Sequence, residues 1–417
     1  MLDITFIRDN IEIIKENCKH RNVTIDIDRL IQVDELRRTK ISEVEELRAI
    51  RKAGSKGKPT SEEIERMRTL GDEIKQKEIE LAEIETEYTE LMMRMPNLTH
   101  PTTPLGGEGD FKVLEEKSVP EFSFTPKDHE ELLMNLDLLD FERGTKVAGA
   151  KFYFVKNDLV RLNQALINYG IDVVTAHGYE LLETPDMAKN EILEGIGFNP
   201  RGTETQIYSI ENTNLSLIGT AEITLGGYHK DEILDLNKGP KKYIALSHCF
   251  RTEAGAYGRE SKGLYRVHQF TKLEMFVYCK PEDSETLHQE LLAIEKEICD
   301  DLELSYRVID IASGDLGGPA YRKFDIEAWM AMKGGDKKSG EFGEITSTSN
   351  CTDYQARRLN IRYRTKTGDT HFVHTLNGTA VVSSRFPIAI VEQHQQADGT
   401  IRIPKVLKKY LGKEIIS

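Results

Sequence analysis

The stretch FRTEAGAYGRESKGLYRVHQFTKLE, residues 250–274, carries the most informative pattern in this chain. An apolar run, YIALSHCF, leads into it, and an alternating segment, LYRVHQFTKLEMFVY, leads out of its glycine-rich, charged loop. Two strands joined by a ligand-gripping turn are therefore expected. Alternate residues of a strand share one face, so Arg251 and Glu253 are expected to point at one ligand. Arginines in fixed positions suit phosphate or carboxylate, although a surface hairpin with ion pairs explains the pattern equally well.

Length and composition limit the class of protein. The chain has 417 residues, which suggests two or three domains, and its net charge of −14 disfavours a general polyanion binder. Local basic patches still decide contact with nucleic acid. No apolar run approaches the ~18 residues that span a bilayer, and the N-terminus lacks a signal-peptide pattern, so neither a membrane span nor secretion is expected. Five scattered cysteines indicate reduced thiols in a cytosolic setting and argue against structural zinc.

Residues before about 105 carry two helical stripes. In the stronger stripe, apolar residues recur at steps of three and four from Met67 to Met95, with Lys77 as the only interruption. That spacing is typical of a coiled-coil seam, and a weaker stripe interrupted by Lys40 precedes it. The breaker segment AGSKGKPT separates the stripes, and Thr60 or Ser61 can cap the second helix. The pattern predicts an antiparallel helical hairpin, either as a binding arm or as a packed or dimerising pair.

The remainder of the chain begins with a Pro-, Gly- and Thr-rich linker at residues 96–110. Strands and helices then alternate without a P-loop or a Rossmann fingerprint. Leu159, Leu162 and Leu166 have helical spacing, and the segments HFVHTLNGTAVV and IRIPKVL predict strands. The segment MKGGDKKSG, residues 332–340, is expected to be a flexible insertion.

Three segments, in order, resemble the motifs of class II aminoacyl-tRNA synthetases in the form found in seryl-tRNA synthetases. GYELLETPDMAK, which contains Pro185, resembles motif 1, residues 250–274 resemble motif 2, and residues 374–412 resemble motif 3. The resemblance covers nearly the whole chain. It implies an α+β fold with an N-terminal antiparallel helical coiled-coil arm and a class II synthetase domain that has a mostly antiparallel sheet flanked by helices. It also implies a tRNA-binding domain at residues 1–105, with its hairpin at about 28–95, and a catalytic domain at residues 106–417.

The resemblance further implies a function. The chain is expected to activate L-serine with ATP and Mg²⁺ to seryl-adenylate, and to transfer the seryl group to the 3′ end of tRNA-Ser, with tRNA-Sec as a second acceptor. A cytoplasmic homodimer with Pro185 at its interface is expected. The alternatives are a paralogue that charges a carrier protein or uses another amino acid, a catalytically inactive tRNA-binding protein, and a structural coiled-coil protein. The long arm argues against the paralogue, and retention of Arg251, Arg266 and Arg385 argues against an inactive protein.

The ATP contacts follow from matches to these motifs. Arg251 matches the arginine at the α-phosphate and the amino-acid carboxylate, and Phe270 matches the aromatic residue that stacks on adenine. Arg385 matches the arginine on the far face of adenine, although Ser384 replaces the usual preceding glycine. Glu344 and Ser347 match the Mg²⁺-holding positions, and oxygen ligands of this kind suit Mg²⁺. The full ATP-binding set is Arg251, Thr252, Glu253, Arg266, Val267, Phe270, Glu344, Ile345, Thr346, Ser347 and Arg385.

The serine pocket is expected to combine acidic and hydroxyl groups. Its predicted members are Thr220, Ala221, Glu222, Arg251, Glu274, Asn377 and Thr379, and Gly219 replaces a usual proline before them. The predicted catalytic residues are Arg251, Arg385 and Glu274. A pocket built to bond a hydroxyl is expected to reject alanine by ~10⁴ or more. On the arm, the predicted tRNA contacts are Arg51, Lys52, Lys56 and Lys58 near the tip.

Overall fold

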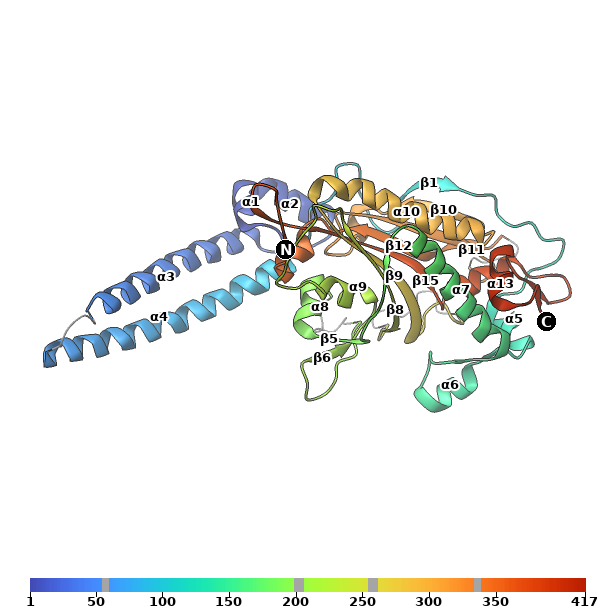
Figure 1. The fold of residues 1–417 in the computed structure, drawn as a ribbon, viewed down its shortest axis with the longest axis horizontal. Coiled ribbons are helices and arrows are strands. Elements are labelled where there is room, and N and C mark those ends of the chain that lie inside the picture. The colour runs from blue at the N-terminus through green and yellow to red at the C-terminus, as the bar shows by residue number, and fades with distance from the viewer. Residues whose placement is uncertain (55–59, 199–205, 254–261, 334–338) are drawn as a thin grey trace. The chain divides into compact units, whose positions relative to one another are not determined.

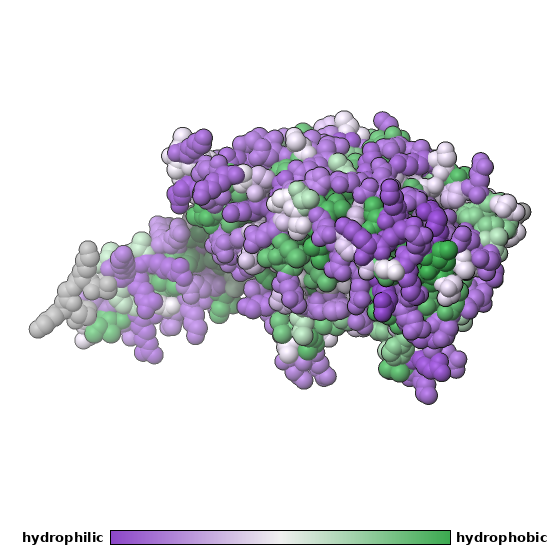
Figure 2. All heavy atoms as spheres, turned by 45° about the vertical axis from the view of Figure 1, so that its right-hand side comes forward, coloured by the Kyte–Doolittle hydropathy of each residue, from purple (hydrophilic) through white to green (hydrophobic). Residues whose placement is uncertain are grey.

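The computed structural model describes residues 1–54, 60–198, 206–253, 262–333 and 339–417 (Figure 1). These residues form two compact units, Met1–Leu98 and Thr99–Ser417. Within the described residues, no helix is both long and apolar enough to cross a membrane. Figure 2 shows one face of the molecule, on which hydrophilic side chains predominate and hydrophobic ones form scattered groups.

The first unit contains four helices: α1 (Ile4–Asp9), α2 (Ile11–His20), α3 (Ile27–Gly54) and α4 (Ser61–Arg94). The antiparallel pair α3 and α4 confirms the predicted helical hairpin, and α1 and α2 were not predicted. The α4 helix begins at Thr60, whose hydroxyl accepts a 3.2 Å bond from the Glu63 amide, while the Glu63 carboxylate accepts a 2.6 Å bond from the Thr60 amide. This reciprocal cap satisfies two amides that have no partner within the helix.

The two lysines that interrupt the helical stripes meet across the hairpin. Lys77 Nζ lies 2.7 Å from Glu43 Oε2, and Lys40 Nζ lies 3.2 Å from the same oxygen. Lys40 also donates a 2.8 Å bond to Glu80 of α4. The four side chains are partly buried, so the charged groups replace apolar seam contacts with ion pairs at this level of the hairpin.

The second unit is built on an eight-stranded sheet in the order β1-β10-β11-β12-β15-β9-β8-β4. Every neighbouring pair is antiparallel except β4 and β8, so the mostly antiparallel sheet is confirmed. In this order the strands are β1 (Lys112–Glu116), β10 (Tyr306–Asp310), β11 (Arg322–Met330), β12 (Glu341–Asn350), β15 (His374–Val382), β9 (Gln269–Cys279), β8 (Lys241–Phe250) and β4 (Glu180–Glu183).

Helices and short strands complete this unit. Its helices are α5 (His129–Asn135), α6 (Phe141–Ala148), α7 (Asn157–Ala176), α8 (Asn190–Ile196), α9 (Ala221–Gly227), α10 (Ser284–Asp301), α11 (Tyr354–Leu359), α12 (Phe386–Gln393) and α13 (Lys408–Leu411). Short 3₁₀ helices span Pro281–Asp283, Ser313–Asp315 and Lys405–Leu407. Small pairings join β2 (Leu139–Asp140) with β3 (Phe154–Val155), β5 (Met187–Lys189) with β6 (Leu215–Leu217), β16 (Ile401–Arg402) with β17 (Ile415–Ile416), and β13 (Arg362–Arg364) with β7 (Ile233–Leu234) and β14 (Thr370–Phe372).

The strand β9 divides the core into two faces. Leu273, Met275 and Val277 belong to the cluster that contains the apolar stripes of α7 and α10. Phe276 and Tyr278, on the opposite face, belong to the cluster formed with α8, α9 and α11. Because side chains alternate along a strand, the face that carries Phe276 also presents Lys272 and Glu274. Lys272 and Glu274 therefore lie on the side of the sheet that is covered by α8, α9 and α11.

The predicted strand boundaries around the motif 2 loop need a correction. The strand β8 ends at Phe250 and β9 begins at Gln269, so Arg251, Glu253 and Arg266 lie outside both strands. The Arg251 amide still donates a 3.0 Å bond to the His268 carbonyl, but Glu253 has a φ of 50°. Strand alternation therefore cannot place Arg251 and Glu253 on one face, because the backbone has left the extended conformation. Residues 254–261 lie outside the described residues, as does most of the predicted insertion at 332–340.

Candidate active site

A cavity of about 440 Å³ brings together most of the predicted serine-binding residues. Its walls come from the start of α9, the residue that follows β8, the segment 317–320, and strands β9, β11, β12 and β15. The predicted residues that line it are Thr220, Glu222, Arg251, Glu274, Glu344, Ser347, Asn377 and Thr379. Ala221 is fully buried in the first turn of α9 and does not line the cavity.

A second cavity, of about 600 Å³, contains Arg266, Asp325, Glu327 and Glu344 among its lining residues. Glu344 therefore lines both cavities. Glu344 is a predicted ATP-binding residue, and most of the predicted serine-binding residues line the first of these cavities. The two predicted binding functions accordingly share one boundary residue.

The acidic end of the first cavity is built on the start of α9. The Thr220 hydroxyl accepts a 3.2 Å bond from the Glu222 amide and donates a 3.1 Å bond to Glu274 Oε2. Lys272 forms an ion pair with the same Glu274 oxygen, and both side chains are buried. Short polar residues at a helix start commonly satisfy a first-turn amide in this way. Here the cap also orients the Glu274 carboxylate toward the cavity.

Glu222 is held by two side-chain amides. Gln355 Nε2 and Asn377 Nδ2 donate to Glu222 Oε1 at 2.8 Å and 3.0 Å. Burial and the neighbouring Glu274 carboxylate raise the pKa of Glu222 to about 7. An ammonium group bound here would favour the ionised carboxylate, because an opposite charge nearby stabilises the charged form.

The predicted arginines are each anchored to neighbouring groups. Arg251 Nε donates a 3.2 Å bond to the Gly219 carbonyl, and its guanidinium carbon lies 5.3 Å from the centre of the Phe270 ring. His268 Nδ1 lies 2.9 Å from the Arg251 carbonyl oxygen, so this histidine contacts the backbone of Arg251. Arg266 pairs with Glu253 at 3.3 Å. These contacts hold the Arg251 side chain at the cavity wall.

Arg385 stands at the start of α12 and reaches Glu344. Its Nη1 atom lies 3.0 Å from Glu344 Oε1 and donates a 2.9 Å bond to the Glu344 carbonyl. Its guanidinium carbon also lies 4.8 Å from the centre of the Tyr265 ring. Burial raises the pKa of Glu344, but the charges of Arg385, Lys323, Arg251 and Lys272 lower it to about 2. Glu344 is therefore ionised at any physiological pH.

Oxygen donors suited to a divalent cation gather beside Glu344. Ser347 lines the first cavity, and Asp325 lines the second. Asp325 Oδ2 pairs with Lys323 at 3.0 Å, whereas its buried Oδ1 has no hydrogen-bond partner. Burial, partly opposed by Lys323, raises the pKa of Asp325 to about 7. Carboxylate and hydroxyl oxygens with one vacant carboxylate atom fit Mg²⁺, which prefers hard oxygen ligands.

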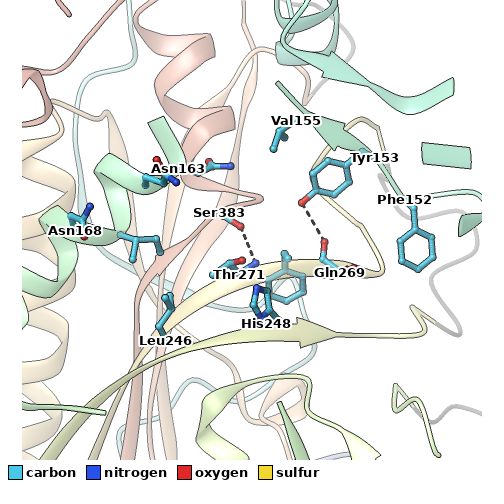
Figure 3. Close-up of a pocket in the computed structure, with 13 residues that line it drawn as sticks. Phe152, Tyr153, Val155, Asn163, Asn168, Leu246, His248, Gln269, Thr271 and Ser383 are labelled. Carbon is cyan, nitrogen blue, oxygen red and sulfur yellow. Dashed lines mark hydrogen bonds between the residues drawn. The ribbon is translucent and has the colours of Figure 1, made fainter. Parts of the chain in front are cut away.

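Phe270 is largely buried and is not among the residues that line the first two cavities, although Arg251, which lines the first, lies beside its ring. A third cavity, of about 580 Å³, has Phe270 among its lining residues, together with residues of α7 and β9 (Figure 3). In this cavity the Thr271 amide donates a 2.9 Å bond to the Ser383 hydroxyl, and the Tyr153 hydroxyl donates a 3.2 Å bond to the Gln269 carbonyl. The Arg251 guanidinium faces the Phe270 ring, so it occupies the vicinity in which adenine was expected to stack.

Several residues of the site were not predicted. They are Tyr265, Lys272, Gln355, Lys323, Asp325 and Glu295. Glu295 is fully buried on α10, where Thr346 Oγ1 donates a 2.8 Å bond to its Oε2 atom. A signal was present for Glu295, because it falls in the apolar stripe that contains Leu291 and Ile298. Lys272 could have been found from strand alternation with Glu274.

The remaining predicted site residues are main-chain neighbours or lie on the hairpin. Ile345 and Thr346 are buried in β12, and Thr252 and Val267 flank the ends of the motif 2 loop. Arg51 and Lys52 are exposed in the last turn of α3. The Arg51 guanidinium packs over Gly71 of α4, 3.7 Å from the position of an added Cβ atom. Lys56 and Lys58 lie outside the described residues.

Two known protein families match separate parts of this chain. Residues 206–394 match the family described as "tRNA synthetase class II core domain (G, H, P, S and T)", and residues 1–99 match "Seryl-tRNA synthetase N-terminal domain". The catalytic unit is therefore that of a class II aminoacyl-tRNA synthetase. The chain is 52% identical to the serine--tRNA ligase of Treponema denticola, over 99% of each chain, and 48% identical to that of Rubrobacter xylanophilus, over 100% of this chain and 99% of the relative. It belongs to the seryl-tRNA synthetase family.

Two solved structures agree with this assignment. The seryl-tRNA synthetase of Pyrococcus horikoshii, complexed with ATP, superposes with a TM-score of 0.89 at 38% identity, over 100% of this chain and 99% of that one. The cytoplasmic serine-tRNA ligase of Naegleria fowleri, in complex with AMP, gives a TM-score of 0.84 at 31% identity, with the same coverage. The similarity extends over both units of the chain.

Proposed function

We propose that this chain joins L-serine to ATP to form seryl-adenylate and pyrophosphate, and then transfers the seryl group to the 3′ end of tRNA-Ser. Full-length similarity to serine--tRNA ligases supports the reaction. The observation that carries the proposal for this site is the convergence of Glu222, Glu274, Arg251 and Glu344 on one cavity. These groups match the needs of an ammonium group, a carboxylate and a phosphate chain.

The reaction requires little covalent chemistry from the protein itself. The serine carboxylate attacks the α-phosphorus of ATP, and the bond to the pyrophosphate leaving group breaks. Arg251 would neutralise charge on the carboxylate and the α-phosphate, while Glu222 and Glu274 would hold the ammonium group. Asn377 and Thr379 would bond the serine hydroxyl. Catalysis then comes from positioning and charge stabilisation.

ATP would occupy the side of the site that contains Arg266 and Arg385. Phe270 would stack on adenine if the Arg251 guanidinium shifted to its phosphate, and Thr252, Glu253, Val267, Ile345 and Thr346 would contribute neighbouring contacts. Glu344 and Ser347, with Asp325 beside them, would hold Mg²⁺. When bound, that ion would neutralise phosphate charge.

The decisive test is serine-dependent exchange of pyrophosphate into ATP. The wild-type chain should exchange with serine, and Arg251→Ala should lose at least about a hundredfold of the rate, because removing a transition-state charge partner costs about 3 kcal/mol or more. Exchange that glycine, threonine or proline supports better than serine would remove the serine assignment. A chain that exchanges with no amino acid would favour a binding role instead.

The arm carries a separate part of the proposal. Residues 1–105 would form the tRNA-binding domain and residues 106–417 the catalytic domain, with Arg51, Lys52, Lys56 and Lys58 contacting tRNA phosphates. Charge removal at Arg51 and Lys52 together should raise KM for tRNA-Ser and reduce its salt dependence, since phosphate contacts release counterions. The rate of serine-dependent pyrophosphate exchange should not change. Loss of exchange in the double variant would assign these residues to the fold.

The assembly and the second acceptor are also proposed. The chain would act in the cytoplasm as a homodimer with Pro185 near the interface, and tRNA-Sec would be charged with serine in addition to tRNA-Ser. Light scattering on a sizing column should give twice the 47.4 kDa chain mass at micromolar concentration. A monomeric mass there would contradict the dimer, and failure to serylate a tRNA-Sec transcript would limit the enzyme to tRNA-Ser.

A further inference from the structure

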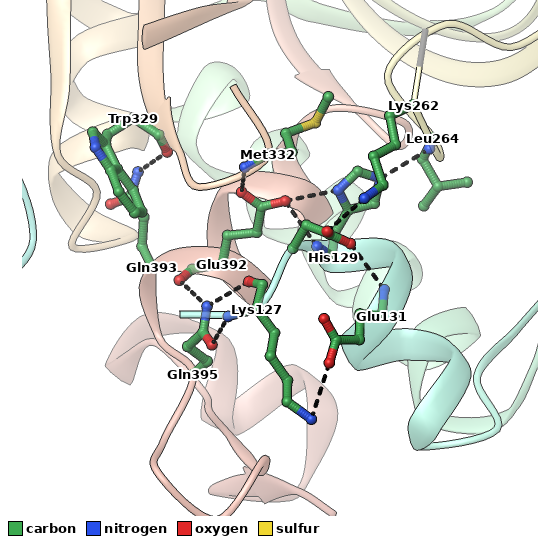
Figure 4. A network of polar contacts seen from close by, with 11 residues as sticks. Lys127, His129, Glu131, Lys262, Leu264, Trp329, Met332, Glu392, Gln393 and Gln395 are labelled. Atoms are coloured by element: carbon green, nitrogen blue, oxygen red, sulfur yellow. Dashed lines mark hydrogen bonds and ion pairs between the residues drawn. The ribbon is translucent and has the colours of Figure 1, made fainter. Parts of the chain in front are cut away.

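A fully buried histidine–glutamate pair lies outside the site. His129 is the first residue of α5, and Glu392 is in α12 (Figure 4). His129 Nδ1 lies 2.7 Å from Glu392 Oε1, and the His129 amide donates a 2.8 Å bond to the same oxygen. Glu392 Oε2 accepts a 3.1 Å bond from the Met332 amide. The carboxylate therefore binds α5 with one oxygen and the end of the β11 region with the other.

The second ring nitrogen of His129 holds the returning arm of the motif 2 loop. The Leu264 amide donates a 3.0 Å bond to His129 Nε2. Nε2 must then be the unprotonated nitrogen, so Nδ1 carries the hydrogen that it donates to Glu392. Lys262, two residues before Leu264, forms a 2.6 Å ion pair with Asp128, which immediately precedes His129. Asp128 and His129, at the start of α5, therefore both hold the segment 262–264.

Gly263 makes this approach possible. Its φ is +56°, and a Cβ atom added to it would lie 2.0 Å from His129 Nε2. Any side chain would therefore both strain the backbone and displace the imidazole ring. The close packing shows that the segment 262–264 and the histidine are fitted to each other.

The pair connects three segments that meet at Tyr265. Leu264 directly precedes Tyr265, Met332 directly precedes Lys333, and Arg385 is the residue from which α12 begins. The Tyr265 ring lies 4.8 Å from the Arg385 guanidinium carbon and 5.0 Å from Lys333 Nζ. Tyr265 and Lys333 each follow a residue that is bonded to His129 or Glu392, and Arg385 precedes the helix α12 that contains Glu392.

We propose that His129 and Glu392 are positioning residues for ATP. They hold the segment that carries Arg266 and Val267 in register with the helix that begins at Arg385, so that the two halves of the nucleotide site face each other. This inference rests on the proposed ATP contacts of those residues. Neither His129 nor Glu392 touches the nucleotide, so the effect is expected on ATP and not on serine.

Two amide variants separate the two bonds of the imidazole ring. In His129→Asn, the side-chain nitrogen can replace Nδ1 and donate to Glu392, but the Leu264 amide loses its acceptor. In His129→Gln, the longer side chain can place its oxygen near the Nε2 position and accept from Leu264. The expected result is a rise of roughly five- to fiftyfold in KM for ATP in His129→Asn, the effect of one buried donor left without a partner. KM for serine should stay within about twofold, and His129→Gln should recover most of the loss.

Local readouts and a matched control complete the experiment. Amide hydrogen exchange should accelerate in a peptide that covers residues 262–270 in His129→Asn but not in His129→Gln. Gly263→Ala, which keeps both His129 and Glu392 but displaces the imidazole ring, should reproduce the ATP effect. The control is His394→Asn, which removes another buried imidazole, one bonded to the Leu302 carbonyl. It should lower stability without changing KM for ATP.

Three results would overturn the inference, and a fourth would remove the proposed function. Equal kinetics of His129→Asn and His129→Gln, with no difference in exchange, would show that the ring only fills space. A parallel rise in KM for serine and ATP would show a general loss of fold. Absence of serine-dependent exchange in the wild-type chain would instead remove the proposed function, whereas normal wild-type exchange with no ATP effect in Gly263→Ala would remove only this inference.

Discussion

Arg385 contacts Glu344 at two points. Its Nη1 atom lies 3.0 Å from the Oε1 atom of the Glu344 carboxylate and donates a 2.9 Å bond to the Glu344 main-chain carbonyl. The first residue stands at the start of α12 and the second is in β12, so the contact joins the start of a helix to the strand that separates the two cavities. Both bonds use the same guanidinium nitrogen. The remaining nitrogens of Arg385 are therefore available to define how a phosphate chain lies beside Glu344.

The conservative substitution Arg385→Lys should be strongly impaired. Lysine keeps the positive charge but has neither the planar fork nor the stacking surface that lies over Tyr265. We expect kcat/KM for ATP in pyrophosphate exchange to fall roughly tenfold to a hundredfold, and the increase in Tm that ATP produces to shrink. Retention of wild-type kinetics in Arg385→Lys would show that only charge matters at this position.

Serine binding should depend on pH through Glu222. The pKa of this carboxyl is raised to about 7, mainly by burial, so below that pH the group is neutral in the ligand-free protein. An ammonium group prefers the ionised form, so binding must release a proton at pH 6. KM for serine should therefore increase as the pH falls below about 7, by at most tenfold per unit, and level off above pH 8.

Glu222→Gln supplies the control for this pH dependence. It removes the titrating group, so KM for serine should be high and nearly independent of pH. Calorimetry in buffers of different ionisation enthalpy should detect proton release when serine binds the wild-type chain at pH 6 but not when it binds the variant. A wild-type KM for serine that is flat between pH 6 and 8 would contradict the assignment of the ammonium site.

Glu295 should stabilise the sheet as a neutral acid. The strands β12 and β15 are paired only from Thr348 to Asn350, and Glu295 reaches the unpaired part, where its Oε2 atom accepts a 2.8 Å bond from the Thr346 hydroxyl. Burial raises its pKa well above the usual value, which favours the neutral, protonated acid. Glu295→Gln should therefore change the free energy of unfolding by less than about 1 kcal/mol, whereas Glu295→Ala should cost about 3 kcal/mol.

The pH dependence of stability gives a second check on Glu295. The folded protein holds this proton more tightly than the unfolded chain, in which a glutamate has a pKa of about 4.3. The free energy of unfolding should then fall as the pH rises above that value, by at most about 1.4 kcal/mol per unit for this group. Urea unfolding of Glu295→Gln between pH 5 and 8 should show a shallower fall. A steeper or unchanged fall would mean that Glu295 is ionised in the folded state.

Gly219→Ala should stabilise the protein. The backbone of Gly219 lies outside the left-handed region, and an added Cβ atom would meet its nearest neighbours, atoms of Arg251 and Phe250, at 3.6 Å, an ordinary contact distance. Alanine restricts the unfolded chain, so a gain of about 0.4–1 kcal/mol is expected in chemical unfolding. Gly263→Ala is the contrasting variant and should destabilise. Loss of stability in Gly219→Ala would show that the loop before α9 needs the freedom of glycine.

Sequence patterns predicted the elements that depend on local periodicity. The seam of the hairpin, the Thr60 cap and the helix around Leu162 all follow from spacing and capping chemistry, and the structure confirms them. The antiparallel sheet came only from the resemblance to a family, because strand order depends on contacts between residues far apart in the chain. The same is true of the cavity that brings Thr220, Glu344 and Asn377 together.

Local backbone geometry and buried polar groups limited the site prediction. Strand alternation failed for Arg251 and Glu253, because a positive φ at Glu253 cannot be read from a period-two pattern. The position of Glu295 in an apolar stripe indicates burial, but neither Glu295 nor His129 reveals its hydrogen-bond partner in the sequence. Their partners, Thr346 and Glu392, lie 51 and 263 residues away along the chain.

Lys40 and Lys77 share the Glu43 carboxylate between α3 and α4, and this contact bears on the register of the two helices. A seam of interchangeable apolar residues can slide by a whole heptad and remain covered. The Lys77–Glu43 pair favours a single alignment, because a slip by one heptad would place Lys77 opposite Leu36 or Ile50. A register fixed in this way keeps each residue of α3 beside the same partner in α4, so the charged side chains along the pair form one constant pattern.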